Sequence, residues 1–298
     1  MRQGCVLSPK LFNLYTEKIF NESDELPGCV VGGENLNNLR YADDTALLAE
    51  SESALQNIVD VVRQNSEEKG LSMNVKKTKT MVVCRDETPD VRIAINGQVL
   101  EQVKKFKYLG QWITDDGRCE CEIKNRIEIA RSTFIKMRDV LISRKLHLEI
   151  RKRLVRCYVL STFLYASESW TLDRQIEDKI NAFEMWIFRR MFRISHLDRK
   201  TNLEVLEMAK AKQTLLRTIQ ERKLQYFGHL IRGKGKQKLL MEGKIEGTRC
   251  KGKQRRTWTS DVTGWCGSSY TKCVRMAEKR KEWSSMTADL LIRRWHPQ

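Results

Sequence analysis

The spacing of hydrophobic residues along the chain changes near residue 118. Before this point short apolar runs alternate with turn residues, and after it apolar positions recur three or four residues apart. The first kind of spacing is typical of short strands and the second of amphipathic helices. We therefore expect an α+β fold class, with strands and helices mixed over residues 1–118 and helices alone afterwards.

Two helices and one turn can be placed in the first part. Ser8 and Pro9 form a typical helix start, and a second helix is expected from about Ser53, ending near Gly70. Between these helices, residues 36–49 predict a strand, a turn and a second strand, with two adjacent aspartates at the tip.

Further strands are expected over 80–84, 91–95, 99–103 and 106–113. Asn96 and Gly97 separate the second of these from the third, and this dipeptide strongly favours a two-residue hairpin turn. The segment 106–113 is expected to be a further strand. Together these elements predict a largely antiparallel sheet with helices.

Four helices are expected over 123–141, 154–165, 176–191 and 203–231, with their aromatic and Met residues in the core. Glycines and lysines then replace the apolar pattern over 233–256, which predicts a basic linker. Two or three short helices follow in 257–298. The expected organisation is thus 1–118, 119–232, 233–256 and 257–298.

Charge divides the chain at the same place. Of 298 residues, 1–118 hold 15 Lys and Arg against 18 Asp and Glu, whereas 119–298 hold 40 against 20. A segment with a net charge of +20 repels itself unless a polyanion binds to it. A solvated helical surface would show a similar composition, but the size of the excess favours nucleic acid as the partner.

Nine cysteines are irregularly spaced, which is typical of free thiols in a reducing compartment such as nucleus or cytoplasm. Cys250, Cys266, Cys273 and His296 lack the short paired spacing of a zinc site, so no zinc is expected. No apolar run approaches the roughly 18 residues that a membrane span needs, so no membrane partner is expected.

Asp43 and Asp44 are the residues most suggestive of chemistry. Adjacent carboxylates repel each other by about 4 kcal/mol at a separation of roughly 4 Å and an effective dielectric of 20. A divalent cation removes this repulsion, and hard carboxylate oxygens suit Mg²⁺, with Mn²⁺ as a possible substitute. Such a site supports phosphoryl displacement. Asp-Asp pairs are also common in solvated turns, so the tetrapeptide Tyr41–Asp44 alone leaves both interpretations open.

Several segments in order resemble the reverse transcriptases of LINE-type (non-LTR) retrotransposons. They are RQGCVLSPKLFNLY (2–15), LRYADDTALLAE (39–50), GLSMNVKKTKTM (70–81), FKYLG (106–110), RRMFRISHLDRKTNLEVL (189–206) and RKLQYFGHLIR (222–232). The resemblance implies a partial polymerase palm over 1–118, a helical thumb and connection over 119–232, and RNA-directed DNA synthesis. The implied partners are an RNA template, a DNA primer and deoxynucleoside triphosphates.

The resemblance also implies roles for individual residues. Asp43 and Asp44 would be metal ligands, and Lys77 would act on the leaving pyrophosphate. The nucleotide and template would contact Gln3, Gly4, Ser8, Pro9 and Tyr41, and the primer end would contact Tyr108, Leu109 and Gly110. For Lys77, an exposed lysine on a basic loop is the alternative.

One feature of the family has no counterpart in the sequence. The family's palm carries a further aspartate upstream of the Arg-Gln-Gly loop, and here Met1 directly precedes that loop. We therefore expect the chain by itself to be inactive or nearly so as a polymerase. The alternative function is a non-catalytic basic module that binds RNA or an RNA–DNA hybrid.

Overall fold

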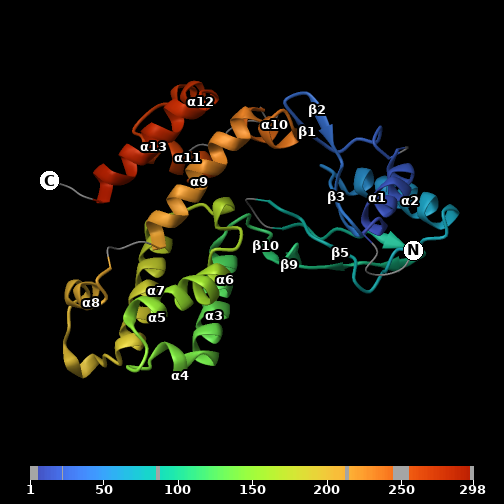
Figure 1. The fold of residues 1–298 in the computed structure, drawn as a ribbon. Coiled ribbons are helices and arrows are strands. Elements are labelled where there is room, and N and C mark those ends of the chain that lie inside the picture. The colour runs from blue at the N-terminus through green and yellow to red at the C-terminus, as the bar shows by residue number, and fades with distance from the viewer. Residues whose placement is uncertain (1–5, 22, 85–87, 212–214, 244–254, 296–298) are drawn as a thin grey trace. The chain divides into compact units, whose positions relative to one another are not determined.

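The computed structural model describes residues 6–21, 23–84, 88–211, 215–243 and 255–295, with only the backbone given for Pro9 and 291–295. Figure 1 shows mixed strands and helices early in the chain and helices later, so the α+β class is confirmed. The chain divides into two compact units. The N-terminal unit comprises 1–117 and 235–250, and the C-terminal unit comprises 118–234 and 251–298.

The N-terminal unit is built from hairpins around two helices, α1 (Ser8–Phe20) and α2 (Glu52–Glu68). Antiparallel pairs join β1 (Cys29–Val31) to β2 (Glu34–Leu36), β3 (Asn38–Tyr41) to β4 (Asp44–Leu47), β6 (Ala94–Ile95) to β7 (Gln98–Val99), and β9 (Lys105–Tyr108) to β10 (Gln111–Thr114). The pair β5 (Lys79–Thr80) and β8 (Glu101–Gln102) is parallel. The core of the N-terminal unit includes the contact of Ile58 and Val62 of α2 with Ile19 and Phe20 of α1.

Local sequence explains several of these elements. Pro9 stands in the first turn of α1, where its missing N–H is not needed. Ser51 caps α2 by accepting a hydrogen bond from the Ala54 N–H. Asn96 and Gly97 both have positive φ, at 51° and 74°, as the predicted hairpin turn requires.

Two expectations for this unit were wrong. Residues 106–113 are not one strand but the hairpin β9–β10, which turns at Leu109 and Gly110 with φ of 47° and 79°. The alternating apolar pattern continues through the turn, so periodicity alone does not show it. The segment 233–256, expected to be a linker, contains α10 (Lys236–Glu242). A Cβ at Gly32 would come within 2.9 Å of Leu239, so α10 lies against the β1–β2 turn.

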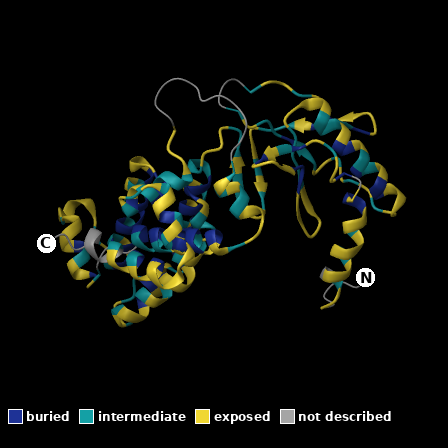
Figure 2. Cartoon of the chain, turned by 90° about the horizontal axis from the view of Figure 1, so that it is seen from above, coloured by how far each residue is buried: buried dark blue, intermediate teal, exposed yellow. Residues whose placement is uncertain are grey.

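The C-terminal unit is helical throughout the part that the structure describes. Its elements are α3 (Glu120–Lys136), α4 (Arg138–Leu141), α5 (Leu148–Leu154), a π-helical turn η1 (Val155–Leu160), α6 (Ser161–Phe163), η2 (Ser167–Ser169), α7 (Arg174–Phe192), η3 (His196–Asp198), α8 (Asn202–Met208), α9 (Leu215–Arg232), α11 (Trp258–Cys266), α12 (Tyr270–Glu278) and α13 (Arg280–Trp295). Buried residues lie on the faces that these helices turn toward one another (Figure 2).

Aromatic rings contact one another within this largely aliphatic core, and most of them stand in the predicted helical stripes. Phe163 contacts Trp170 and Phe183 with ring centroids 5.3 and 5.1 Å apart. The expected helix over 203–231 was wrong, because α8 ends at Met208 and Lys210 adopts a φ of 43°. The residue at that break is not a glycine, which is why the sequence does not reveal it.

Candidate metal-binding hairpin

The two adjacent aspartates lie at the exposed tip of the β3–β4 hairpin. Tyr41 pairs with Asp44 as the last rung, so Ala42 and Asp43 form a two-residue turn. Ala42 has a φ of 53°, in the left-handed region that costs a non-glycine residue about 1–2 kcal/mol. Both carboxylates are exposed, and Tyr41 is 66% exposed. The predicted strand–turn–strand, with its aspartates at the tip, is confirmed.

Buried amides hold the base of this hairpin. The Asn38 side chain donates to Asp24 Oδ1 at 2.9 Å, and Asn37 donates to the Leu26 carbonyl at 2.9 Å. The Leu48 N–H donates to the Asn37 carbonyl at 2.7 Å. Sequence reasoning assigned no role to these asparagines. Their signal is that asparagine is disfavoured in strands, so two in succession at a strand start need a polar partner.

A basic side chain joins the hairpin to α1. Arg40 lies 4.8 Å over the ring of Phe20 and 3.6 Å from the Glu17 carboxylate. The ring is buried and the ion pair is partly exposed. The hairpin therefore projects from a packed base and keeps its tip free of the core.

The second hairpin tip lies within electrostatic reach of the first. Tyr108 is the last residue of β9, directly before the Leu109–Gly110 turn. Burial raises the pKa of Tyr108 above its ordinary value, and the Asp44 carboxylate raises this pKa further. Charge on Asp44 thus influences Tyr108, although 64 residues separate them in sequence. The structure brings together one predicted metal ligand and one predicted primer contact.

Lys77 follows a turn held by Asn74. The Lys77 N–H donates to the Asn74 side chain at 3.1 Å, and the Thr78 hydroxyl donates to the Asn74 carbonyl at 2.9 Å. These bonds explain the Asn-x-x-Lys-Thr spacing as a local turn. The Lys77 side chain is exposed, and within the described residues no contact joins it to Asp43 or Asp44.

The residues predicted to contact the nucleotide are only partly described. Gln3 and Gly4 lie outside the described residues, while Ser8 and Pro9 begin α1. Farther along α1, Leu11, Leu14 and Tyr15 line a hollow of about 430 Å³ together with Lys18 and Lys69. The Tyr15 hydroxyl donates to the Lys69 carbonyl, which ties α1 to the end of α2.

Metal binding at this tip would rest on two carboxylates. Among the residues that the structure describes, no group of three or more His, Cys, Asp or Glu side chains is placed to hold a metal ion. Mg²⁺ is commonly held by one or two carboxylates, with water and substrate phosphates as its other ligands. The Asp43–Asp44 pair fits that requirement in number and in exposure.

The two downstream segments of the resemblance serve the C-terminal core as well as its surface. Lys223, in the segment 222–232, is fully buried and donates to Asp261 at 2.5 Å and to the Trp170 carbonyl at 2.6 Å. Burial lowers the pKa of Lys223 to about 8, against the opposing effect of Asp261. A Cβ on Gly228 would lie 2.6 Å from Trp283, so this glycine lets α13 approach α9.

The four residues considered for a zinc site are only partly described. Cys250 and His296 lie outside the described residues. Cys266 shares a hydrogen bond with Cys273, which raises the pKa of Cys266 and lowers that of Cys273. The absence of zinc stays a prediction. No helix in the described part of the chain is long and apolar enough to cross a membrane.

Comparison with known proteins bears on the N-terminal unit directly. Residues 1–113 match the family model described as reverse transcriptase (RNA-dependent DNA polymerase). A transposon-derived protein of Caenorhabditis elegans is 27% identical over 273 residues, which is 85% of this chain and 95% of that protein. The match outside residues 1–113 shows that the similarity includes the helical unit.

Two retrotransposon proteins are also similar. The Pol polyprotein of the type-1 retrotransposable element R2 of Nasonia vitripennis is 28% identical over 143 residues, 45% of this chain. The RNA-directed DNA polymerase of the mobile element jockey of Drosophila funebris is 24% identical over 197 residues, 63% of this chain. The aligned parts are 14% and 21% of those two proteins.

Proposed function

We propose that this chain, which belongs to the reverse transcriptases of non-LTR retrotransposons, contributes to RNA-directed DNA synthesis through the Asp43–Asp44 tip. The observation that carries the proposal is the pair of adjacent, exposed carboxylates at the tip of the β3–β4 hairpin. The influence of the Asp44 charge on the pKa of Tyr108 supports it, since a primer end would have to lie near the metal. The proposed partners are an RNA template, a DNA primer and deoxynucleoside triphosphates.

Asp43 and Asp44 would bind Mg²⁺. When bound, divalent ions stabilise the attacking and leaving oxygens of a phosphoryl displacement. The exposure of both carboxylates leaves room for the phosphates and waters that complete the coordination of Mg²⁺. In this proposal Asp43 is the principal ligand and Asp44 its partner.

Other residues of the N-terminal unit would position the substrates. Tyr108, Leu109 and Gly110 would hold the primer end, since they lie at the turn of the β9–β10 hairpin. Lys77 would interact with the pyrophosphate as it leaves. Gln3, Gly4, Ser8, Pro9 and Tyr41 would line the nucleotide and template. The N-terminal unit corresponds in this proposal to a palm, and the helices after residue 118 to a thumb.

Two carboxylates are fewer than a two-metal site generally uses, so we propose that the chain alone synthesises little DNA. Primer extension on a poly(rA) template with Mg²⁺ or Mn²⁺ measures this. Robust synthesis that Asp43→Asn abolishes would overturn the proposed inactivity and confirm the site. Synthesis that survives Asp43→Asn would overturn the site itself.

Metal binding can be tested without any synthesis. The difference in phenolate absorbance between the unmodified chain and Tyr108→Phe reports the titration of Tyr108. Mg²⁺ is expected to lower the pKa of Tyr108, because it neutralises the Asp44 charge that raises this pKa. Asp43→Asn should abolish the response to Mg²⁺, and the control Asp60→Asn, an exposed carboxylate on α2, should preserve it. A Tyr108 pKa that Mg²⁺ leaves unchanged would contradict the proposal.

A purely binding role is the alternative, favoured by the net charge of +20 on residues 119–298. It predicts that Asp43→Asn leaves affinity for RNA unchanged and that Mg²⁺ has no effect at Tyr108. The titration therefore separates the two functions.

A further inference from the structure

A pocket in the C-terminal unit is lined by arginines that the proposed polymerase site does not use. It lies between the α3–α4 segment and α7 and has a volume of about 410 Å³. Its lining comprises Phe134, Ile135, Arg138, Ile142, Trp186, Arg189, Arg190, Arg193, Ile194 and Ser195, with no acidic side chain among them. Five of the lining residues, from Arg189 to Ser195, belong to the segment 189–206, in which the sequence assigned no role to individual residues.

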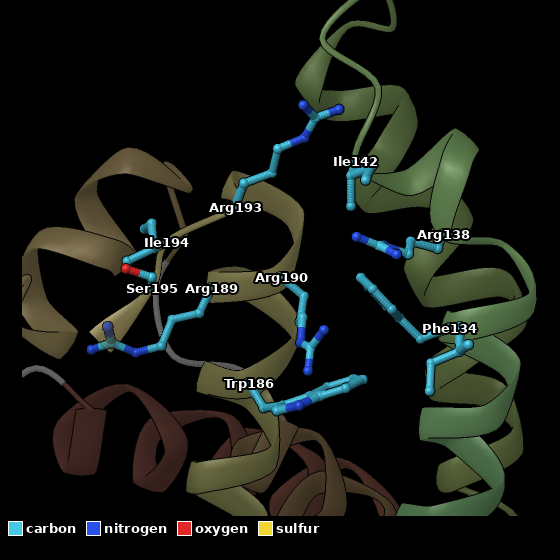
Figure 3. Close-up of a pocket in the computed structure, with 10 residues that line it drawn as sticks. Phe134, Arg138, Ile142, Trp186, Arg189, Arg190, Arg193, Ile194 and Ser195 are labelled. Atoms are coloured by element: carbon cyan, nitrogen blue, oxygen red, sulfur yellow. The ribbon is translucent and has the colours of Figure 1, made fainter. Parts of the chain in front are cut away.

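The guanidinium groups are arranged around this space in different ways. Figure 3 shows Arg138 from α4 and Arg190 from α7 pointing into the space between the helices, with Arg190 above the ring of Trp186. The distance from Arg190 to that ring is 5.4 Å. Arg189 points away and donates to the Lys200 carbonyl and the Asn202 side chain, at 2.9 and 3.0 Å. Arg189 is therefore held by hydrogen bonds outside the pocket, whereas Arg138 and Arg190 point into it and Arg193 lines it.

Helix ends do not account for this much charge. Basic residues commonly offset the partial negative charge at a helix C-terminus, about −0.5 for each of α3 and α7. Three guanidinium groups exceed these two partial charges by about two positive units. Arg193 also sits at the C-cap of α7 with a φ of 58°, a position that favours glycine. A side chain is kept there at a conformational cost.

The floor of the pocket is apolar and aromatic. Phe134 packs edge-on against Trp186 with ring centroids 5.2 Å apart, and Ile142 lines the rim. An anion alone needs no such floor. A nucleotide unit of a nucleic-acid strand needs both parts, because its phosphate pairs with guanidinium groups and its base packs on aromatic and guanidinium planes.

We propose that the pocket formed by Arg138, Arg190, Arg193 and Trp186 binds one nucleotide unit of a single-stranded nucleic acid, holding its phosphate with the arginines. A volume of about 410 Å³ lies within the range of roughly 300–1,000 Å³ typical of ligand pockets. A single strand fits because its bases are free to enter a concave site, whereas those of a duplex are stacked inside it. The choice of nucleic acid as ligand rests on the proposed polymerase function.

The test compares two variants of equal charge. The first carries Arg138→Gln, Arg190→Gln and Arg193→Gln. The control carries Arg156→Gln, Arg174→Gln and Arg280→Gln, three exposed arginines of the same unit that do not line the pocket. Fluorescence anisotropy with labelled oligouridylate RNA and oligothymidylate DNA, in EDTA, measures affinity over a range of salt concentrations.

The pocket variant is expected to bind at least about tenfold more weakly than the control, and each lost phosphate contact lowers the slope of log affinity against log salt by about 0.7. Weaker binding of both the RNA and the DNA means that the pocket recognises groups that the two share, the phosphate and the base. Weaker binding of the RNA alone means that the pocket also recognises the 2′-hydroxyl. Equal affinities of the two variants on both strands would overturn the proposal. Circular dichroism confirms that both variants are folded.

A second readout locates the strand directly. Photocrosslinking of an RNA that carries one 4-thiouridine is expected to mark the peptide containing Trp186 or Phe134. Crosslinks confined to other peptides would contradict the pocket even if affinity fell. Because EDTA removes the metal, these results do not depend on Asp43, and failure of the polymerase proposal would appear separately in the Tyr108 titration.

Discussion

Asp44 in the N-terminal unit and Asp261 in the C-terminal unit are carboxylates in opposite environments. Asp44 stands at an exposed hairpin tip beside a second aspartate. Asp261 is fully buried and accepts hydrogen bonds from Lys223, Arg256 and the Leu172 N–H. The exposed Asp44 carboxylate is accessible to a ligand, whereas the buried Asp261 carboxylate is neutralised by basic side chains of its own unit. The comparison shows that an acidic residue can stand exposed in one unit and be enclosed by basic partners in the other.

The largest effect should come from breaking the buried pair. Lys223→Ala would leave the Asp261 carboxylate buried without its main partner, at a cost of about 3–5 kcal/mol in the free energy of unfolding. Urea denaturation followed by circular dichroism measures this cost. The control Lys281→Ala, an exposed residue of α13, should change stability little. A loss below that of an ordinary surface substitution would show that the pair is not buried as described.

A smaller loss is expected where α13 approaches α9. Gly228→Ala would place a methyl group 2.6 Å from the Trp283 ring and cost about 1–3 kcal/mol by overpacking. Gly264→Ala is the matched control, since nothing lies within 4 Å of its Cβ position in α11. That substitution should stabilise its helix by up to about 1 kcal/mol. Thermal unfolding of both variants measures the change in stability, which should be a loss for Gly228→Ala and a gain for Gly264→Ala. A gain in both variants would contradict this packing.

The hairpin tip should respond to backbone conformation rather than to packing. Ala42→Val introduces a branched side chain at a φ of 53° and should destabilise the N-terminal unit by about 1 kcal/mol or more. Ala42→Gly removes the unfavourable contact and should stabilise the N-terminal unit. Hydrogen exchange of the β3–β4 amides reports both. Faster exchange in the glycine variant than in the valine variant would contradict the conformation described.

The smallest effect concerns an ion pair near the surface. Hydrogen bonds and charge from Lys179, followed by those from Lys124, lower the pKa of Glu120 to about 2 from its ordinary 4.5. Its contribution to stability is therefore present above about pH 4.5 and is lost as pH falls through the folded-state pKa of about 2. Because 39% of the Glu120 side chain is exposed to solvent, this contribution should stay below about 1 kcal/mol. Glu120→Gln should remove that part of the acid dependence in urea titrations, whereas Glu128→Gln, an exposed residue on the same helix, should retain it.

Sequence patterns predicted the elements whose local chemistry is distinctive. The Asn96–Gly97 turn and the start of α1 at Ser8 have side chains suited to their backbone conformation, and the aspartate tip is marked by polar residues between two apolar runs. The turn at Leu109 does not, because leucine rarely adopts positive φ and the apolar alternation runs through it.

The roles of charged residues were harder to predict. A lysine in a helix normally marks the solvent face, so the burial of Lys223 depends on Asp261, 38 residues away, and on Trp170. The same limit applies to the arginine pocket, which needs Arg138 and Arg190 from separate helices. The proximity of Asp44 to Tyr108 likewise follows from tertiary packing, whereas the exposure of the tip follows from its turn sequence.

The attachment of α11, α12 and α13 to α9 has a consequence for synthesis on the ribosome. Lys223, Phe227 and Gly228 leave the exit tunnel well before Asp261 and Trp283, their partners in the folded unit. Until those partners emerge, α9 presents a lysine, an aromatic ring and a glycine gap to solvent. A message cut short between codons 233 and 256 would encode a product that keeps this surface permanently exposed. Such a product would be a good client for chaperones and proteases.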